Sequence, residues 1–308
     1  MNRDHTSPQR CATIDLRTGD IVRMAAEMVS IKQVRVGQPV SYGGEYTTRS
    51  DTVLGLVAAG YAEGVPRTAM GAPVTVAGRV CSIAGRVAMD QLVVDLGPDA
   101  TEQPGSEAVF WGEGGLSLQE WAEAAAIPAD AVRSYLGPRT AIAISTRVDT
   151  AEEMESIGAL LASVLTAGDA VILTGELGAG KTTLTRGLGA ALGARGTVQS
   201  PTFVIARTHE TDSVPLLHVD AYRLGDGALL ADLDLDFEGS ITVAEWGAPL
   251  TNALAAWFDV RIDRASGADA DPLDPDADDP RTLTIRAGGA LSRERLLPLL
   301  RTSIPEAL

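Results

Sequence analysis

The sequence predicts two domains, of which the first is mainly β and the second is α/β with a mixed sheet. Up to about residue 112, valine-rich segments broken by glycine are typical of a twisted antiparallel sheet or barrel. After about residue 141, segments with helical spacing alternate with short apolar segments, which is the α/β pattern. A chain of 308 residues is long enough for two cores.

The composition excludes several classes of protein. With 45% hydrophobic and 21% charged residues the chain is globular. A formal net charge of −16 argues against general electrostatic affinity for nucleic acid or an anionic membrane, although a local basic groove stays open. The N-terminus lacks the apolar core of a signal peptide and no apolar run is long enough to span a bilayer, so we expect a cytoplasmic protein. Cys11 and Cys81 have no metal-ligand spacing.

The β elements of the first domain are expected at 28–34, 52–61, 72–97 and 107–112, followed by a helix at 117–126. The turn at Gly137-Pro138 is the expected boundary. The division is then an N-terminal extension at 1–22, a β domain at 23–140 and an α/β domain at 141–308.

In the second domain, Thr150 and Glu153 form a capping box before a helix that carries Met154, Ile157 and Leu161 at helical spacing. A strand at 170–174 and a helix from about Thr182 follow. Further strands are expected at 202–208, 215–223, 241–246, 257–263 and 282–287, and a last helix at 292–301, bent near Pro298. The acidic stretch 265–280 is expected to be a solvated loop, with metal binding as the alternative.

The turn between the 170–174 strand and its following helix matches the P-loop pattern G-x-x-x-x-G-K-T. Gly175, Gly178 and Gly180 permit close approach of backbone N–H groups to a phosphate, and the helix N-terminus adds partial positive charge. Lys181 would contact the outer phosphates, and the Thr182 hydroxyl would ligate magnesium. The predicted ATP-binding residues are Gly175, Glu176, Leu177, Gly178, Ala179, Gly180, Lys181, Thr182, Thr183 and Trp246.

Three later segments suggest the rest of such a site. VQSPTF (198–203) contains Ser200 and Thr202, where a switch segment could sense the terminal phosphate. HVDAYRL (218–224) places Asp220 near a strand end, and ITVAEW (241–246) is an apolar strand that ends in Glu245. A carboxylate there can hold magnesium or orient the attacking water. The alternatives are satisfied strand-end carboxylates and, for Trp246, plain packing.

In this order and spacing, GELGAGKTT, SPTF, HVDAYRL and VAEW resemble the TsaE-type ATPases, over about 142–300. The resemblance implies a small ATPase that docks on a TsaB–TsaD pair in the synthesis of threonylcarbamoyl-adenosine in tRNA, contacting tRNA only indirectly. It implies ATP and Mg²⁺ as ligands, Lys181, Asp220 and Glu245 as catalytic residues, and Thr182 and Glu245 as metal ligands. A P-loop kinase of small molecules is a further possible function, but no acceptor-pocket motif supports it.

The first domain carries a second set of motifs, VSYGG (40–44), GYAEGVPR (60–67), GRVAMDQ (85–91) and SYLGPR (134–139). Together they resemble the C-terminal domain of alanine racemase, over about 23–139. The resemblance implies a β barrel in which Tyr42 acts as acid/base, Tyr61 and Met89 line the substrate pocket across a dimer, and Tyr135 contacts the phosphate of pyridoxal phosphate.

The sequence departs from that family because the barrel with the Schiff-base lysine is missing. The chain has two lysines, and Lys32 lies in a predicted strand while Lys181 lies in the P-loop. Pyridoxal phosphate is therefore not expected to bind this chain alone. Racemase activity is the alternative function only if another chain or upstream sequence completes the site, and dimerisation through this domain stays open.

Overall fold

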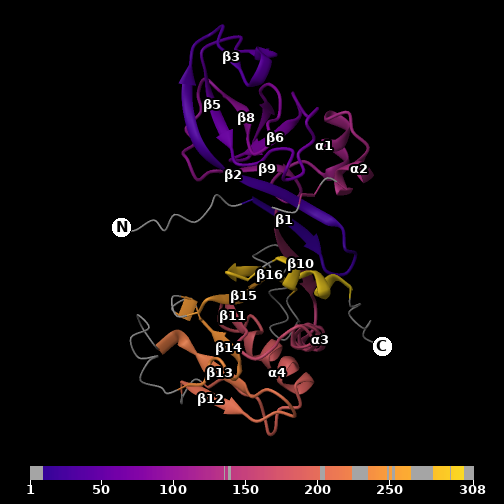
Figure 1. Cartoon of the computed structure of the whole chain (residues 1–308), viewed down its shortest axis with the longest axis vertical. Helices are drawn as coiled ribbons and strands as arrows, with labels where there is room; N and C mark the ends of the chain where they lie inside the picture. Colours follow the sequence, from indigo (N-terminus) through magenta and orange to yellow (C-terminus); the bar gives the residue numbers. More distant parts are fainter. Residues whose placement is uncertain are drawn as a thin grey trace, which may run out of the picture. The chain divides into compact units, whose positions relative to one another are not determined.

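The structure is a computed structural model that describes residues 10–134, 136–137, 140–201, 205–223, 235–247, 250–251, 254–264, 280–291 and 293–301. The described chain forms two compact units (Figure 1). The first consists mainly of Asp20–Ile142, and the second begins at Ala143.

The first unit is a six-stranded antiparallel barrel. The strands run in the order β2-β5-β8-β7-β6-β9, and β9 pairs back with β2 to close the sheet (Figure 1). Their bounds are β2 Ile21–Val34, β5 Thr52–Val57, β6 Pro73–Val76, β7 Arg79–Ile83, β8 Leu92–Gly97 and β9 Glu107–Trp111. Strand β1 (Arg10–Asp15) pairs with β2, and β3 (Pro39–Val40) pairs with β4 (Tyr46–Thr47) beside a short 3₁₀ turn, Tyr42–Gly44. The predicted mainly β fold is confirmed.

Aromatic side chains fill the barrel core next to helix α1 (Leu118–Ala124). Trp121 of α1 packs on Trp111 of β9 with 5.0 Å between ring centroids, and its indole N–H donates to the carbonyl of Pro73 at 2.9 Å. Ser117 and Glu120 cap α1 reciprocally, and the short helix α2 (Ala129–Ser134) follows. This packing gives α1 a fixed position on the barrel.

The run at 72–97, expected as one strand region, forms three strands. The chain reverses at Ala77-Gly78, where both residues have positive φ, so β6 and β7 pair as a hairpin. The segment between β7 and β8 leaves the sheet and contributes residues to a cavity described below.

The second unit is a mixed sheet in the order β12-β13-β14-β11-β15-β16-β10. Its four middle strands, β13, β14, β11 and β15, are parallel to their neighbours in that group, and the remaining pairs are antiparallel. The strands are β10 Ala141–Val148, β11 Ala170–Gly175, β12 Ala206–His209, β13 Leu216–Asp220, β14 Ile241–Glu245, β15 Ala256–Arg264 and β16 Arg281–Gly289. The predicted α/β fold with a mixed sheet is confirmed.

Two helices, α3 (Ala151–Ala162) and α4 (Lys181–Ala191), lie side by side in this unit (Figure 1). They approach closely through two glycines. A Cβ on Gly158 would lie 2.1 Å from the carbonyl oxygen of Leu184, and one on Gly187 would lie 2.0 Å from that of Glu155. The two helix backbones are therefore in direct contact, and a side chain at either glycine would push the helices apart.

At the start of α3, the hydroxyl of Thr150 accepts from the Glu153 N–H, as the predicted capping box requires. The Glu153 carboxylate, however, accepts from the N–H of Asp149 and not from that of Thr150. The capping box is thus only half formed, because the N–H that binds the Glu153 carboxylate belongs to the residue before the N-cap.

The C-terminal helix expected at 292–301 is not an α-helix in its described residues. Two 3₁₀ turns, Arg293–Arg295 and Leu297–Arg301, occupy this segment. Pro298 has no N–H to donate and its ring crowds the preceding turn, so a continuous α-helix is disfavoured. Among the described residues, no helix combines the length and the apolar character that a membrane crossing needs.

Candidate nucleotide-binding site

The glycine-rich turn lies at the carboxyl end of β11 and leads directly into α4. Gly178 and Gly180 have φ of 79° and 109°, a region that favours glycine. Gly180 is also the N-cap of α4, where no side chain caps the first turn and no acidic residue follows in it. The N–H groups of that turn are therefore available to an anion, as P-loop binding requires.

The side chains of the turn are arranged to leave its backbone accessible. Leu177 is 88% exposed at the tip, Glu176 is exposed, and Ala179 is buried beneath. A Cβ on Gly178 would meet nothing within 4 Å, whereas one on Gly175 would lie 2.5 Å from the carbonyl oxygen of Ile262. Gly175 is thus needed for packing on β15, and Gly178 for its backbone angle.

Lys181, the first residue of α4, is buried at the centre of the site. Its Nζ donates to the carbonyl oxygens of Gly175 at 2.8 Å and Glu176 at 2.9 Å, and lies 4.1 Å from the centroid of the Trp246 ring. Burial lowers the pKa of Lys181, while the charges of Glu245 and Asp220 oppose that effect. The ammonium group therefore lies where the turn's carbonyls, an aromatic face and two carboxylates surround it.

Thr182 and Glu245 meet across 63 residues of sequence. The Thr182 hydroxyl donates to Oε1 of Glu245 at 2.8 Å. Nε2 of His218 lies 3.1 Å from the same oxygen. Burial by itself would raise the pKa of Glu245, but the hydrogen bonds from His218 and Thr182 hold that pKa below its ordinary value. Glu245 is therefore a carboxylate beside the first turn of α4.

Asp220 and Glu245 end two neighbouring parallel strands at the same level, since the register pairs them directly. Both are buried. Asp220 accepts a hydrogen bond from the Tyr222 N–H at 3.1 Å. Trp246 follows with a φ of 59°, and its ring lies 5.7 Å from that of Tyr222. The carboxyl ends of β13, β14 and β11 thus place both acids, the turn and the indole at one edge of the sheet, where α/β sheets bind ligands.

The structure brings together most of the predicted nucleotide-site residues that it describes. Thr183 lies in the first turn of α4. Ser200 is described and partly exposed, but Thr202 lies outside the described residues, as do Tyr135 and positions 265–279 of the acidic stretch. His218 had no role in the sequence interpretation although it lies in the HVDAYRL segment, because only strand register brings it to Glu245.

The oxygen donors present suit magnesium. A threonine hydroxyl and carboxylate oxygens are ligands that Mg²⁺ accepts, usually together with water and substrate phosphates. Thr182 and Glu245 supply such oxygens next to the phosphate-binding turn, and Asp220 lies beside Glu245. Among the described residues there is no group of three or more His, Cys, Asp or Glu side chains arranged to hold a metal alone. A magnesium ion held by Thr182 and Glu245 would need further oxygen ligands, which water or substrate phosphates commonly supply.

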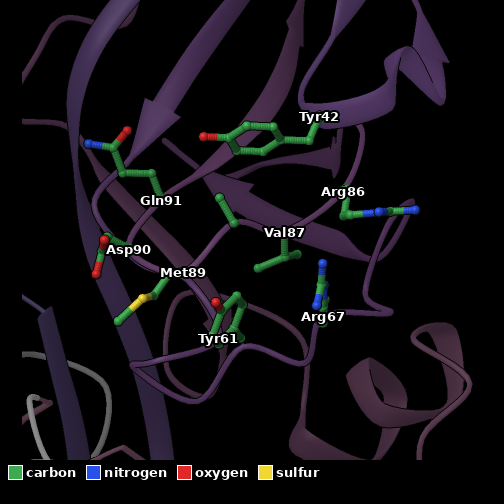
Figure 2. Close-up of a pocket in the computed structure, with 9 residues that line it drawn as sticks. Tyr42, Tyr61, Arg67, Arg86, Val87, Met89, Asp90 and Gln91 are labelled. Carbon is green, nitrogen blue, oxygen red and sulfur yellow. The ribbon is translucent and has the colours of Figure 1, made fainter.

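The barrel has a cavity of its own, with a volume of about 570 Å³ (Figure 2). Tyr42 and Tyr61 lie on opposite sides of it, with Met89 and Gln91 on the loop between β7 and β8. Tyr42 is 75% exposed, and the guanidinium of Arg67 lies 5.8 Å from the Tyr61 ring centroid. Three residues predicted from the racemase-like motifs therefore share one cavity, and neither lysine of the chain lines it.

A parallel strand, a phosphate-binding turn with its lysine, a helix and a strand-end carboxylate define a P-loop nucleotide-binding domain. Residues 148–270 match the family "Threonylcarbamoyl adenosine biosynthesis protein TsaE". The chain is 56% identical over 126 residues to the TsaE protein of Streptomyces coelicolor, covering 39% of this chain and 85% of that protein. The chain therefore belongs to the TsaE family of P-loop ATPases.

Residues 21–143 match the family "Alanine racemase, C-terminal domain". The S. coelicolor alanine racemase is 44% identical over 137 residues, which cover 43% of this chain and 35% of that protein. The solved alanine racemase of D-cycloserine-producing Streptomyces lavendulae is 44% identical, covering 40% of this chain and 33% of that one, with a TM-score of 0.38. The chain thus spans about a third of the length of these racemases. Both resemblances drawn from the sequence motifs are confirmed, and the racemase similarity is limited to the C-terminal domain.

Proposed function

We propose that this protein binds and hydrolyses Mg·ATP as the ATPase of the tRNA threonylcarbamoyl-adenosine machinery. One observation carries the proposal. The Thr182 hydroxyl and the Glu245 carboxylate, distant in sequence, are 2.8 Å apart beside the phosphate-binding turn. The TsaE relative is named for tRNA threonylcarbamoyladenosine biosynthesis, which supplies the biological setting.

Each residue then has a distinct task. The N–H groups of the turn and of the first turn of α4 bind the phosphates, and Lys181 exchanges its two carbonyl partners for phosphate oxygens, which form stronger charge-assisted hydrogen bonds. Thr182 and Glu245 would hold the metal, and Asp220 would support that site. When bound, magnesium neutralises charge on the phosphate oxygens. Glu245 also orients the attacking water, and Trp246 lies against the nucleotide.

The proposed partner is a TsaB–TsaD-type transferase pair, with tRNA contacted only through it. The family membership supports a place in this machinery. Ser200 and Thr202, in the segment before β12, would sense the terminal phosphate and transmit nucleotide state to that partner. Measuring association with a TsaB–TsaD pair in the presence of ATP, of ADP and of no nucleotide tests this part, and association that ignores the nucleotide would contradict it.

The central test is nucleotide binding by a Lys181→Ala variant, measured by calorimetry. Losing a charged hydrogen bond to phosphate costs about 1.5–3 kcal/mol, or a roughly 10- to 150-fold weaker affinity. The chain offers a matched control in Lys32→Ala, which removes its other lysine from an exposed position on β2 in the barrel. Equal ATP affinity in the two variants would refute the assignment of the P-loop.

A second candidate function belongs to the barrel. The cavity that gathers Tyr42, Tyr61 and Met89 (Figure 2) favours racemase chemistry if a pyridoxal phosphate-bearing chain completes it. Alone, this chain is proposed not to bind the cofactor, because Lys32 is on β2 and Lys181 is in the P-loop. Mixing the protein with pyridoxal phosphate and recording the visible spectrum tests this. A lysine-dependent aldimine band would contradict the proposal that the barrel alone is inactive.

A further inference from the structure

His218 is a completely buried imidazole directly behind the proposed metal site. It lies on β13 with 0% of its side chain exposed, and the register pairs it with Val243, two residues before Glu245 on β14. Burying a polar ring is unfavourable unless it is hydrogen-bonded. The bond between Nε2 of His218 and Oε1 of Glu245, 3.1 Å long, satisfies one of its two nitrogens.

The direction of this bond follows from the acceptor. Oε1 of Glu245 is already an acceptor, because the hydroxyl of Thr182 donates to it. A carboxylate can only accept, so Nε2 of His218 must carry the hydrogen. The Thr182 hydroxyl donates to the same oxygen at 2.8 Å. Two donors from two different elements, β13 and α4, thus converge on Oε1 and restrict rotation of the carboxylate, while neither bond uses Oε2.

We propose that His218 is a positioning residue, which fixes the Glu245 carboxylate in the orientation that magnesium and the attacking water require. The inference rests on the proposed ATPase function and adds a residue to it. His218 would act only through Glu245 and contact neither nucleotide nor metal. Groups that orient a metal-binding carboxylate from behind commonly change metal affinity or activity about 10- to 100-fold when removed.

A purely structural histidine would behave differently, and the chain contains a comparator. His209 lies on the neighbouring strand β12 and is also buried, with 5% of its surface exposed. Its Nε2 has no hydrogen-bond partner among the described residues. The same substitution at His209 therefore removes a buried imidazole from the same sheet without removing a donor to Glu245.

The experiment compares His218→Leu, His218→Gln and His209→Leu in the full chain by calorimetric ATP titration, with Mg²⁺ and with EDTA. For His218→Leu we expect ATP affinity in EDTA within about twofold of wild type, and a roughly 10- to 100-fold higher Mg²⁺ concentration for half-maximal enhancement of ATP affinity. The amide of the His218→Gln variant can donate to the carboxylate, so it should recover most of the Mg²⁺ response. His209→Leu should respond to Mg²⁺ like wild type.

An unchanged Mg²⁺ response in His218→Leu, or an equal loss in the leucine and glutamine variants, would overturn the inference while leaving the proposed function intact. Wild-type protein that binds no ATP would instead contradict the proposed function, and the inference with it.

A measurement on the wild-type protein tests the proposal even where the variants do not fold. The chain has three histidines, so ¹⁵N-histidine spectra contain few signals to assign. We expect His218 to carry hydrogen on Nε2 and to keep it there on addition of Mg·ATP. A neutral ring with hydrogen on Nδ1 alone would show that His218 does not donate to Glu245 and would refute the proposal.

Discussion

Replacing Gly187 by alanine tests the close contact of α3 and α4. The substitution has two opposite effects on stability, a gain in helix propensity and a steric overlap with α3. Alanine favours a helix over glycine by about 0.5–1 kcal/mol. The new Cβ, however, would lie 2.0 Å from the carbonyl oxygen of Glu155 and 2.5 Å from its Cα. Both are backbone atoms, so no side-chain rotation relieves the overlap, and the helices must separate by about 1 Å.

Overpacking of this kind costs about 1–3 kcal/mol, and contact with backbone places the cost near the upper end. After subtracting the gain in helix propensity we expect a net loss of about 2 kcal/mol in the stability of this helix pair. Hydrogen exchange of α3 and α4 peptides in the full chain measures it, with peptides from the barrel strand β5 as internal reference. Slower exchange in α3 and α4 would refute the packing argument, because the gain in helix propensity would then exceed the cost of the overlap.

The control for helix propensity alone is Ala190→Gly, at an exposed position three residues further along α4. It makes the reverse change at a solvent-exposed position and should cost about 0.5–1 kcal/mol. A loss as large as that of Gly187→Ala would mean that the measurement reports α4 fraying and not its contact with α3.

Three further predictions concern single side chains. Trp246→Leu removes the aromatic face 4.1 Å from the Lys181 ammonium and should weaken ATP binding about 2- to 30-fold. Trp246→Phe keeps an aromatic face and should retain most of the affinity, so equal losses in the two variants would contradict the cation–π contribution. Burial and the hydrogen bond to Asp95 raise the pKa of Tyr46 to about 12. The phenol of the unfolded chain ionises at about pH 10, so the stability of the barrel should fall as the pH rises from about 10 to about 12. Denaturant titrations should show a smaller fall for Tyr46→Phe. Burial raises the pKa of the Cys81 thiol, so alkylation by iodoacetamide, followed by peptide mass, should be slow until the barrel unfolds, and prompt labelling of the native protein would contradict its buried position.

The phosphate-binding turn could be predicted from sequence because its requirements are local. The positive φ angles of Gly178 and Gly180 require glycine, and Lys181 comes directly after them in the sequence. The local pattern therefore identifies the turn without knowledge of the fold. The same holds for α1, where Ser117 and Glu120 cap a helix that the sequence placed within two residues at either end.

Contacts that depend on strand order could not be predicted. Strand β14 lies beside β11 in the sheet, although β12 and β13 come between them in the sequence. This strand order brings Glu245, at the end of β14, to Thr182 at the start of α4. The role of His218 depends further on the register of β13 with β14, since a shift of one residue would turn its ring to the opposite face. Strand β10, which begins at the boundary between the two predicted domains, was also absent from the predicted elements, because a single strand there has no distinguishing local pattern.

The backbone at Trp246 has a practical consequence for studying this protein. Its left-handed conformation aims one of only four tryptophans in the chain at the ammonium of Lys181. Indole emission responds to nearby charge, so exchange of that lysine's partners would alter the fluorescence of this ring directly. With the proposed ATP binding, the emission of Trp246 would report occupancy of the site in real time without an attached dye.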